Sequence, residues 1–146
     1  MSARTLLLIH AGSTLAMVGV MWSVQLVVYP QFRQVSAGVF KEYAARHANR
    51  IVAGLAPFAP VEAVTALLIF VSGPAGVPRW EAFVAGAILA VGWIATGFHY
   101  APLHGRLQAE GADPVLIERL IRSNWLRTGL WAVRGAMALR FLAIGL

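Results

Sequence analysis

Four long apolar stretches alternate with polar segments along the chain. They run over about residues 5–29, 50–71, 80–100 and 124–146, and each is close to the ~20 apolar residues that a helix needs to cross a bilayer. None of them alternates apolar and polar residues as a membrane barrel strand does, and a backbone in lipid must satisfy its own hydrogen bonds. The pattern therefore predicts an all-α fold, with residues 1–146 forming one integral membrane domain built as a four-helix transmembrane bundle.

Proline and glycine mark the expected ends of these helices. Pro30 is expected to end the first span and Pro102 the third. Two polar connectors, residues 31–49 and 104–123, separate the first span from the second and the third from the fourth. Both connectors are expected to be partly helical, with a turn in the second at residues 111–114, where Gly and Asp-Pro come together.

The composition agrees with a membrane protein. The chain is 59% hydrophobic and 12% charged, with a mean hydropathy of +0.70, whereas about 25% of the residues in a soluble domain are charged. The expected partner of the excess apolar surface is the lipid bilayer. The absence of cysteine excludes disulfides, thiolate metal sites and a cysteine nucleophile. The first apolar stretch is too long for a signal-peptide core, so we expect it to be retained as a helix.

The distribution of basic residues predicts the orientation. The net charge is +6, but most of the arginines flank apolar segments, so we expect no nucleic-acid binding. The two connectors and their edges hold Arg33, Lys41, Arg46, Arg50, Arg106, Arg119, Arg122 and Arg127, whereas the other side holds Arg4, Arg79 and Arg140. Because basic loops stay inside, we expect cytoplasmic connectors and outside termini, in a bacterial inner membrane.

The fourth span carries polar residues that lipid should exclude. Asn124, Arg127, Trp131 and Arg134 fall at offsets of 0, 3, 7 and 10, which places them on one helical face. Arg134 lies ~15 Å along the helix axis from Asn124, near mid-membrane. Glu62 is the carboxylate deep in another span, so the sequence predicts a Glu62–Arg134 or Glu62–Arg127 pair. Such a pair either belongs to a functional site or only fixes helix packing.

Polar residues also gather near the expected cytoplasmic ends of the other segments. Gln25 and Tyr29 lie close to the end of the first span, and Tyr43, His47 and Arg50 follow at offsets of 0, 4 and 7 on one face of the first connector. A lone amide in lipid needs a partner, whereas an aromatic residue here can be an interfacial anchor. We take Gln25, Tyr29 and Arg50 as candidate cofactor-binding or substrate-binding residues.

Three histidines come from segments that end on the same predicted side. His47, His99 and His104 are therefore expected to converge, either as ligands of a metal such as iron or copper or as acid–base groups. No strict metal-ligand spacing is present, so metal-free hydrogen bonding at the interface stays open.

The C-terminal third contains two motifs, A-T-G-F-H-Y-A-P-L-H-G-R-L and S-N-W-L-R-T, with Thr96, Pro102, Leu103, Leu107, Asn124, Arg127 and Thr128. At these positions the chain resembles the anthrone oxygenase-like family of small four-helix membrane proteins. His104 stands where that family commonly has asparagine. The resemblance implies oxygenation of a hydrophobic, often polyketide-derived aromatic substrate. A weaker resemblance, carried by His10 and Asn124, is to the small membrane protoporphyrinogen oxidase of bacteria; the Asn-Glu-x-Pro-like segment expected there reads Asn124-Trp125-Leu126-Arg127.

Three functional hypotheses follow. The first is an oxidoreductase or oxygenase acting on a lipophilic aromatic or quinone-like molecule. In it, the catalytic candidates are His99, His104, Asn124, Arg127 and Arg134, the cofactor-binding candidates are Gln25, Tyr29, Arg50, Glu62 and Trp131, and the metal candidates are His47, His99 and His104. The second is a non-enzymatic protein that binds or transports an anionic or quinone-like molecule, and the third is a structural subunit. Whether a metal is bound and whether the chain forms a homo-oligomer are left open.

Overall fold

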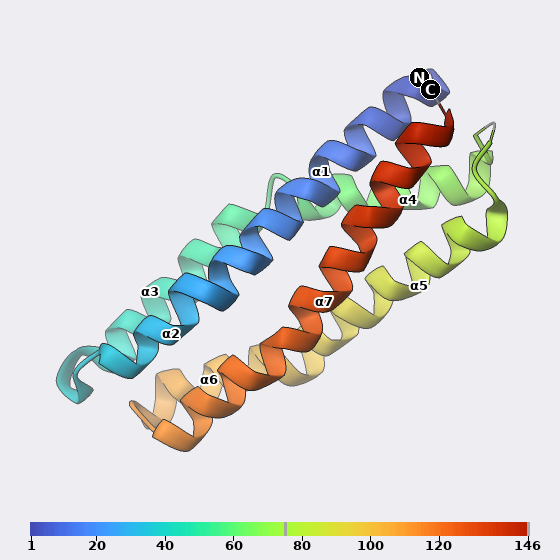
Figure 1. Ribbon diagram of the computed structural model, residues 1–146. Coiled ribbons are helices and arrows are strands. Elements are labelled where there is room, and N and C mark those ends of the chain that lie inside the picture. Colours follow the sequence, from blue (N-terminus) through green and yellow to red (C-terminus); the bar gives the residue numbers. More distant parts are fainter. Residues whose placement is uncertain (75, 146) are drawn as a thin grey trace.

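The computed structural model describes residues 1–74 and 76–145, which form helices joined by short turns and contain no strand. Four long helical segments follow one another, Ala3–Gln34, Ala37–Ser72, Arg79–Glu110 and Pro114–Gly145. Figure 1 shows them running in alternating directions, with the N- and C-terminal ends side by side. The first three segments are long and apolar enough to cross a membrane. The predicted all-α fold with four helices is confirmed.

Two of the segments contain a short π-helix before a proline. The first segment consists of α1 (Ala3–Ser23), the π-helix η1 (Val24–Val28), α2 (Tyr29–Gln31) and the 3₁₀-helix η2 (Phe32–Gln34). The third consists of α5 (Arg79–Ala95), the π-helix η3 (Thr96–Tyr100) and α6 (Ala101–Glu110).

The prediction that Pro30 and Pro102 end these helices is wrong. A proline has no N–H, and its ring clashes with the carbonyl four residues earlier in an α-helix. Here the turn before each proline is widened. The N–H of Tyr29 donates to the carbonyl of Val24, five residues back, and the N–H of Ala101 donates to Thr96 in the same way. The helices therefore continue through both prolines and absorb much of the two predicted connectors.

The second segment bends in its middle. It consists of α3 (Ala37–Leu55) and α4 (Ala59–Ser72), separated by a turn at residues 56–58. Pro57 and Pro60 each remove a backbone donor here, so the regular helical ladder cannot pass. Figure 1 shows the change of direction between α3 and α4. The predicted span 50–71 therefore straddles a break instead of forming one straight helix.

The fourth segment, α7 (Pro114–Gly145), is a continuous helix of 32 residues. It begins at the predicted turn, where Asp113 Oδ1 accepts hydrogen bonds from the N–H groups of Val115 and Leu116. Among the described residues, three helical segments are long and apolar enough to cross a membrane, and α7 is not one of them. Its arginines lower its hydropathy, so the expected span 124–146 lacks an apolar signal of its own; Leu146 lies outside the described residues.

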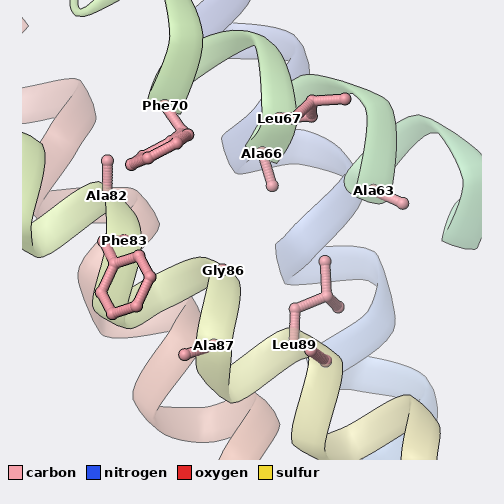
Figure 2. Close-up of a pocket in the computed structure, with 10 residues that line it drawn as sticks. Ala63, Ala66, Leu67, Phe70, Ala82, Phe83, Gly86, Ala87 and Leu89 are labelled. Atoms are coloured by element: carbon pink, nitrogen blue, oxygen red, sulfur yellow. The ribbon is translucent and has the colours of Figure 1, made fainter.

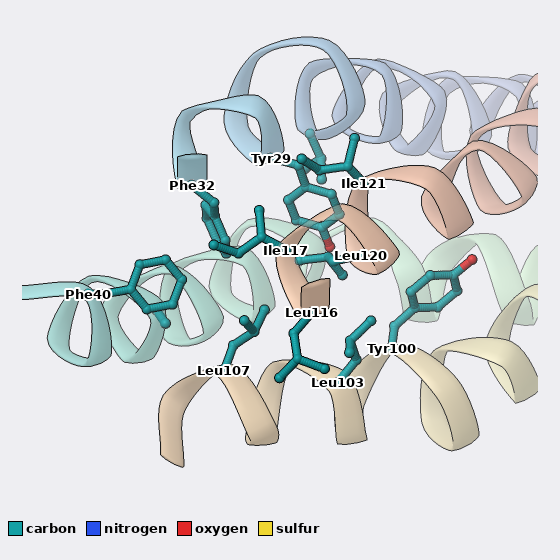
Figure 3. Packing of buried hydrophobic residues seen from close by; sticks show 12 residues of the cluster. Tyr29, Phe32, Phe40, Tyr100, Leu103, Leu107, Leu116, Ile117, Leu120 and Ile121 are labelled. Carbon is teal, nitrogen blue, oxygen red and sulfur yellow. The ribbon is translucent and has the colours of Figure 1, made fainter. Parts of the chain in front are cut away.

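The most extensive contact between two helices joins α1 and α7. α1 packs against α4 and α7, α5 packs against the same two helices, and α3 packs against α6. The largest core cluster, shown in Figure 3, joins the ends of the first and third segments to α3 and the start of α7. At that end Arg33 Nε donates to Glu118 Oε1 over 2.5 Å, and this hydrogen bond holds the pKa of the Glu118 carboxyl below its usual range.

Candidate functional site

A buried ion pair forms the first polar centre, here called the Glu62 centre and defined by Glu62, Trp131 and Arg134. Arg134 Nε donates to Glu62 Oε1 over 3.0 Å, and Nη2 lies 2.9 Å from the same oxygen. Trp131 Nε1 donates to the other carboxylate oxygen over 3.3 Å. Both charged side chains are almost completely enclosed, with 1% and 0% of the Arg134 and Glu62 side chains exposed.

The Glu62 centre confirms the predicted Glu62–Arg134 pair and excludes the Glu62–Arg127 alternative. Trp131 and Arg134 are three residues apart, so α7 presents both to the same side, where α4 brings Glu62. Arg134 Nη1 also donates to the backbone carbonyl of Ala85 in α5. Three helices therefore meet at this arginine, and no sequence pattern indicated that α5 supplies a carbonyl.

His10 extends this centre, although its position near the N-terminus gave no reason to include it. The His10 Nδ1 and Thr65 Oγ1 atoms are 2.9 Å apart, and Thr65 Oγ1 donates to the carbonyl of Val61 over 2.7 Å. Because the Thr65 hydroxyl donates its single proton to that carbonyl, it accepts from His10, and His10 Nδ1 is the donor. Both side chains are buried, one turn of α4 away from Glu62.

The second polar group lies at the other end of the molecule and is here called the histidine–tyrosine cluster: Tyr29, His47, His104 and Arg127. Arg127 Nη2 donates to the Tyr29 hydroxyl over 3.1 Å. The same hydroxyl is 2.9 Å from His104 Nε2. The His47 and His104 rings are 5.5 Å apart at 31°, and the Arg127 guanidinium lies 4.4 Å from the centre of the Tyr100 ring.

One hydrogen-bond direction in this cluster follows from its donor. Arg127 can only donate, so the Tyr29 hydroxyl accepts from it. The direction of the bond between the hydroxyl and His104 Nε2 depends on the His104 tautomer: if the hydroxyl donates, His104 carries its proton on Nδ1. Figure 3 shows the Tyr29 ring packed beside Leu120 and Ile121 of α7, with its hydroxyl turned into the space between helices.

Three nitrogen atoms of the histidine–tyrosine cluster are enclosed without a hydrogen-bond partner among the described residues. They are His47 Nε2, His104 Nδ1 and Arg127 Nε. Buried polar atoms are nearly always partnered, so three unpartnered nitrogen atoms in one cluster need an explanation. The cluster is not sealed, because His47 is only partly buried.

Gln25 and Asn124 lie beside this cluster and bind one another. Asn124 Nδ2 donates to Gln25 Oε1 over 2.7 Å, and Gln25 Nε2 donates to the carbonyl of Ile121 over 3.2 Å. Thr128 Oγ1 donates to the Asn124 carbonyl. The lone amide of the first helix thus finds its partner on α7. Asn124 Oδ1 stays without a partner among the described side chains and backbone.

His99 does not join His47 and His104. It is five residues before His104, a separation that turns the two side chains ~140° apart on a helix. Its ring instead packs edge-on against Tyr100, 4.9 Å between centres. The predicted three-histidine metal centre is therefore wrong as a set, and the described residues contain no group of three histidine or acidic side chains placed to hold a metal ion.

Arg50 is exposed and forms no hydrogen bond or ion pair with any described residue, so its predicted role in binding a ligand stays a prediction. It lies on the half of α3 next to the bend, where Ile51 and Leu55 pack against the core. In contrast, Tyr100 was not selected from the sequence. It supplies the ring under Arg127, and its hydroxyl donates to the carbonyl of Ser123 over 2.8 Å.

The two π-helices position the cluster. Tyr29 follows η1 directly, Tyr100 ends η3, and His104 lies one turn further on the same face as Tyr100. Single π-helical turns inside α-helices occur frequently at functional sites. The signal in the sequence was the proline after each apolar stretch, which indicated a helix end instead of a widened turn.

An apolar groove of about 360 Å³ lies between α4 and α5, near the Glu62 centre (Figure 2). Small residues form most of its walls: Ala63, Ala66, Ala82, Gly86, Ala87 and Ala90. Leu89 lines the groove and also packs on Trp131 in the core. The groove has no charged or hydrogen-bonding side chain, so it adds apolar volume but no chemistry.

No protein-family model matches the chain, and no curated protein or solved structure is significantly similar to it.

Proposed function

We propose that this chain is a four-helix transmembrane bundle of the bacterial inner membrane that oxidises a lipophilic aromatic or quinone-like molecule at the histidine–tyrosine cluster. The observation that carries the proposal is the set of three enclosed, unpartnered nitrogen atoms in this cluster, at His47, His104 and Arg127. A ligand that offers an oxygen to Arg127 Nε and an acidic hydrogen to His47 Nε2 would give these atoms partners.

The bundle proposal requires α7 to cross the membrane despite its arginines. Its apolar side chains Leu126, Val133 and Leu139 are exposed, while Arg127 and Arg134 are buried against the other helices. A helix that buries its charged side chains against the other helices and exposes leucine and valine to lipid can cross the membrane as part of the bundle. The basic residues near the turns at residues 35–36 and 111–113 support cytoplasmic placement of those turns, with both termini outside.

The absence of cysteine allows a direct topology test. Ser36→Cys and Ala112→Cys would each introduce the one cysteine of the chain, at turns joining the long segments, with Ser2→Cys as the matched site near the N-terminus. We expect a membrane-impermeant thiol reagent added to whole cells to label position 2 and to spare positions 36 and 112. The reverse pattern would overturn the orientation, and labelling at both ends from outside would overturn the membrane crossing.

The charge of the site favours an oxygen-bearing ligand over a cation. Arg127 is buried and positively charged, so it suits an enolate or phenolate oxygen, and His104 adds a second donor in the tautomer that carries its proton on Nδ1. The same charge disfavours a metal cation beside it. Phe32 and Tyr29 are buried aromatic rings of the core, and the Phe32 and His47 ring centres are 5.2 Å apart. The ligand proposed for the cluster is therefore a planar aromatic molecule with one acidic position.

The residues have distinct roles in this proposal. His47 Nε2 removes a proton from an activated CH₂ of the substrate, and the resulting enolate oxygen is held by Arg127 and His104. Molecular oxygen is the co-reactant: the CH₂ becomes a C=O, one oxygen atom enters the product, and the other leaves as water with the two hydrogens. Gln25 and Asn124 fix the α1–α7 distance next to the site, and the Glu62 centre keeps α4, α5 and α7 in register.

The second candidate function is non-enzymatic binding of a quinone-like or anionic molecule at the same cluster. It rests on the same three unpartnered atoms and needs no base. The two candidates differ in what His47 does.

The test uses detergent-purified protein, anthrone as the probe, and oxygen uptake together with probe binding as readouts. We expect the wild type to bind anthrone and consume oxygen, and His47→Gln to bind but lose roughly 10²–10⁴-fold in rate, the usual contribution of a general base. His99→Gln is the matched control and should keep both properties. Binding without oxygen uptake in the wild type would favour the non-enzymatic alternative. Equal losses in His47→Gln and His99→Gln would overturn the assignment to the cluster.

A further inference from the structure

A separate polar pocket of about 160 Å³ opens on the outer surface where α6 meets the start of α7. It is lined by Phe98, His99, Pro102, Leu103, Arg106 and Arg119. None of these side chains belongs to the histidine–tyrosine cluster or to the Glu62 centre. The pocket thus remains to be explained.

The pocket has two guanidinium groups with unused donors. Arg106 forms a bidentate pair with Glu110, through Nε at 2.8 Å and Nη2 at 3.2 Å, which leaves Nη1 free for another acceptor. Arg119 is exposed and forms no hydrogen bond or ion pair with any residue that the structure describes. Glu110 balances the charge of Arg106 only, so the two arginines leave a net positive charge at the pocket. The planar guanidinium group of arginine is well suited to phosphate oxygens.

His99 also lines the pocket. Its Nε2 atom is enclosed and has no hydrogen-bond partner within the described chain, although the edge-on contact with Tyr100 fixes the ring. An enclosed nitrogen beside two arginines is suited to an anionic oxygen and is costly to leave empty.

The surroundings of the pocket distinguish a lipid from a free anion. Phe98 lines the pocket and is 85% exposed, with Ile94 exposed one turn earlier on the apolar part of the same helix. The pocket therefore lies at the boundary where an apolar helix surface gives way to charged side chains. A phospholipid places its phosphate at this depth and its acyl chains along the apolar surface below.

We propose that this pocket binds the phosphate group of an anionic membrane phospholipid, held by Arg106, Arg119 and His99, with an acyl chain lying against Phe98. The proposal is independent of the reaction at the histidine–tyrosine cluster.

The test compares lipids retained by purified protein in native mass spectrometry, after exchange into mixed micelles with equal phosphatidylglycerol and phosphatidylcholine. We expect the wild type to retain phosphatidylglycerol preferentially. Arg119→Gln should lower that retention by about tenfold, more than the roughly five-fold expected from removing one charge near an anionic surface. Arg122→Gln is the matched control, because Arg122 is one turn away, has a side chain that is 84% exposed, and does not line the pocket. It should change retention little.

Further measurements distinguish a bound lipid from general surface attraction and from a free anion. Equal losses for Arg119→Gln and Arg122→Gln would show general surface attraction and overturn the proposal. Displacement of the lipid by millimolar inorganic phosphate would mean that the pocket takes a free anion and would equally overturn it. Phe98→Ser should weaken retention of phosphatidylglycerol, while a phosphate-only site would be insensitive to that change.

Discussion

Glu62 and Arg134, 72 residues apart in sequence, form an ion pair in which neither side chain reaches the surface. A charge that loses its partner in such surroundings is strongly destabilising, whereas replacing both partners with neutral groups costs much less. We therefore expect Arg134→Met to lower the free energy of unfolding by about 3–5 kcal/mol, and Glu62→Gln combined with Arg134→Met to lose less than Arg134→Met alone. Thermal unfolding in detergent, followed by tryptophan fluorescence, measures both.

The half-exposed pair between Arg140 and Glu81 is the control for that experiment. Arg140→Met should cause a smaller loss, since the Arg140 side chain is 56% exposed and solvent already screens its interaction with Glu81. Losses that simply add in the double variant of the buried pair would contradict the coupling between Glu62 and Arg134.

The contact between Gly92 and Trp131 leaves no room for a side chain on α5. A Cβ atom on Gly92 would lie 2.7 Å from Trp131 Cζ3 and 2.9 Å from Cη2. Gly92→Ala should therefore displace the indole that donates to Glu62 and destabilise the protein by about 1–3 kcal/mol. Gly86→Ala on the same helix meets nothing within 4 Å, so it should be neutral or stabilising by up to ~1 kcal/mol, as alanine favours a helix. Unfolding midpoints that shift in the same direction for the two variants would contradict this packing.

The Gln25–Asn124 amide pair should contribute to the junction of α1 and α7. Gln25→Leu removes the acceptor of Asn124 Nδ2 and the donor to the Ile121 carbonyl, leaving both groups buried. We expect a loss of about 1–3 kcal/mol. Gln31→Leu on the same segment is exposed and serves as the control in the same unfolding measurement. A stability of Gln25→Leu equal to that of Gln31→Leu would show that the pair is energetically neutral.

Removing a single hydroxyl group tests the histidine–tyrosine cluster. Tyr29→Phe leaves Arg127 Nη2 and His104 Nε2 without their common partner. It should weaken anthrone binding and lower stability by about 1–3 kcal/mol. Tyr43→Phe is the matched control, because Tyr43 packs on Phe32 through its ring and its hydroxyl has no partner within the described chain. Unchanged anthrone binding in Tyr29→Phe would argue against the cluster as the binding site.

The polar face of α7 could be predicted from the sequence because a regular helix makes spacing informative. Asn124, Arg127, Trp131 and Arg134 share one face in an unbroken α-helix, and α7 is unbroken. Glu62 is the carboxylate deep in another span, and an unpaired buried charge is costly. Glu62 could therefore be predicted as the partner of Arg134. The four helices themselves followed from the same regularity, applied to hydrophobic positions.

The residues near the prolines could not be placed in this way. A π-helical turn adds one residue without changing the composition of the segment, so no periodic signal reveals it. The faces of His99, Tyr100 and His104 depend on that extra residue and on the helix continuing past Pro102. Within α3, His47 is partly buried whereas Arg50, three residues later, is exposed, and the spacing that groups both on one face does not separate them.

The π-helical turns recur at a constant interval. The residues of η1, 24–28, and those of η3, 96–100, are 72 positions apart, as are Pro30 and Pro102. The same interval separates Glu62 from Arg134. The two hairpins of the chain, residues 3–72 and 79–145, therefore share the spacing of the widened turn and its proline, although the second segment bends at residues 56–58 and α7 is unbroken. Positions 62 and 134, one in each hairpin, carry a carboxylate and a guanidinium group. The ion pair thus joins the two hairpins at equivalent points.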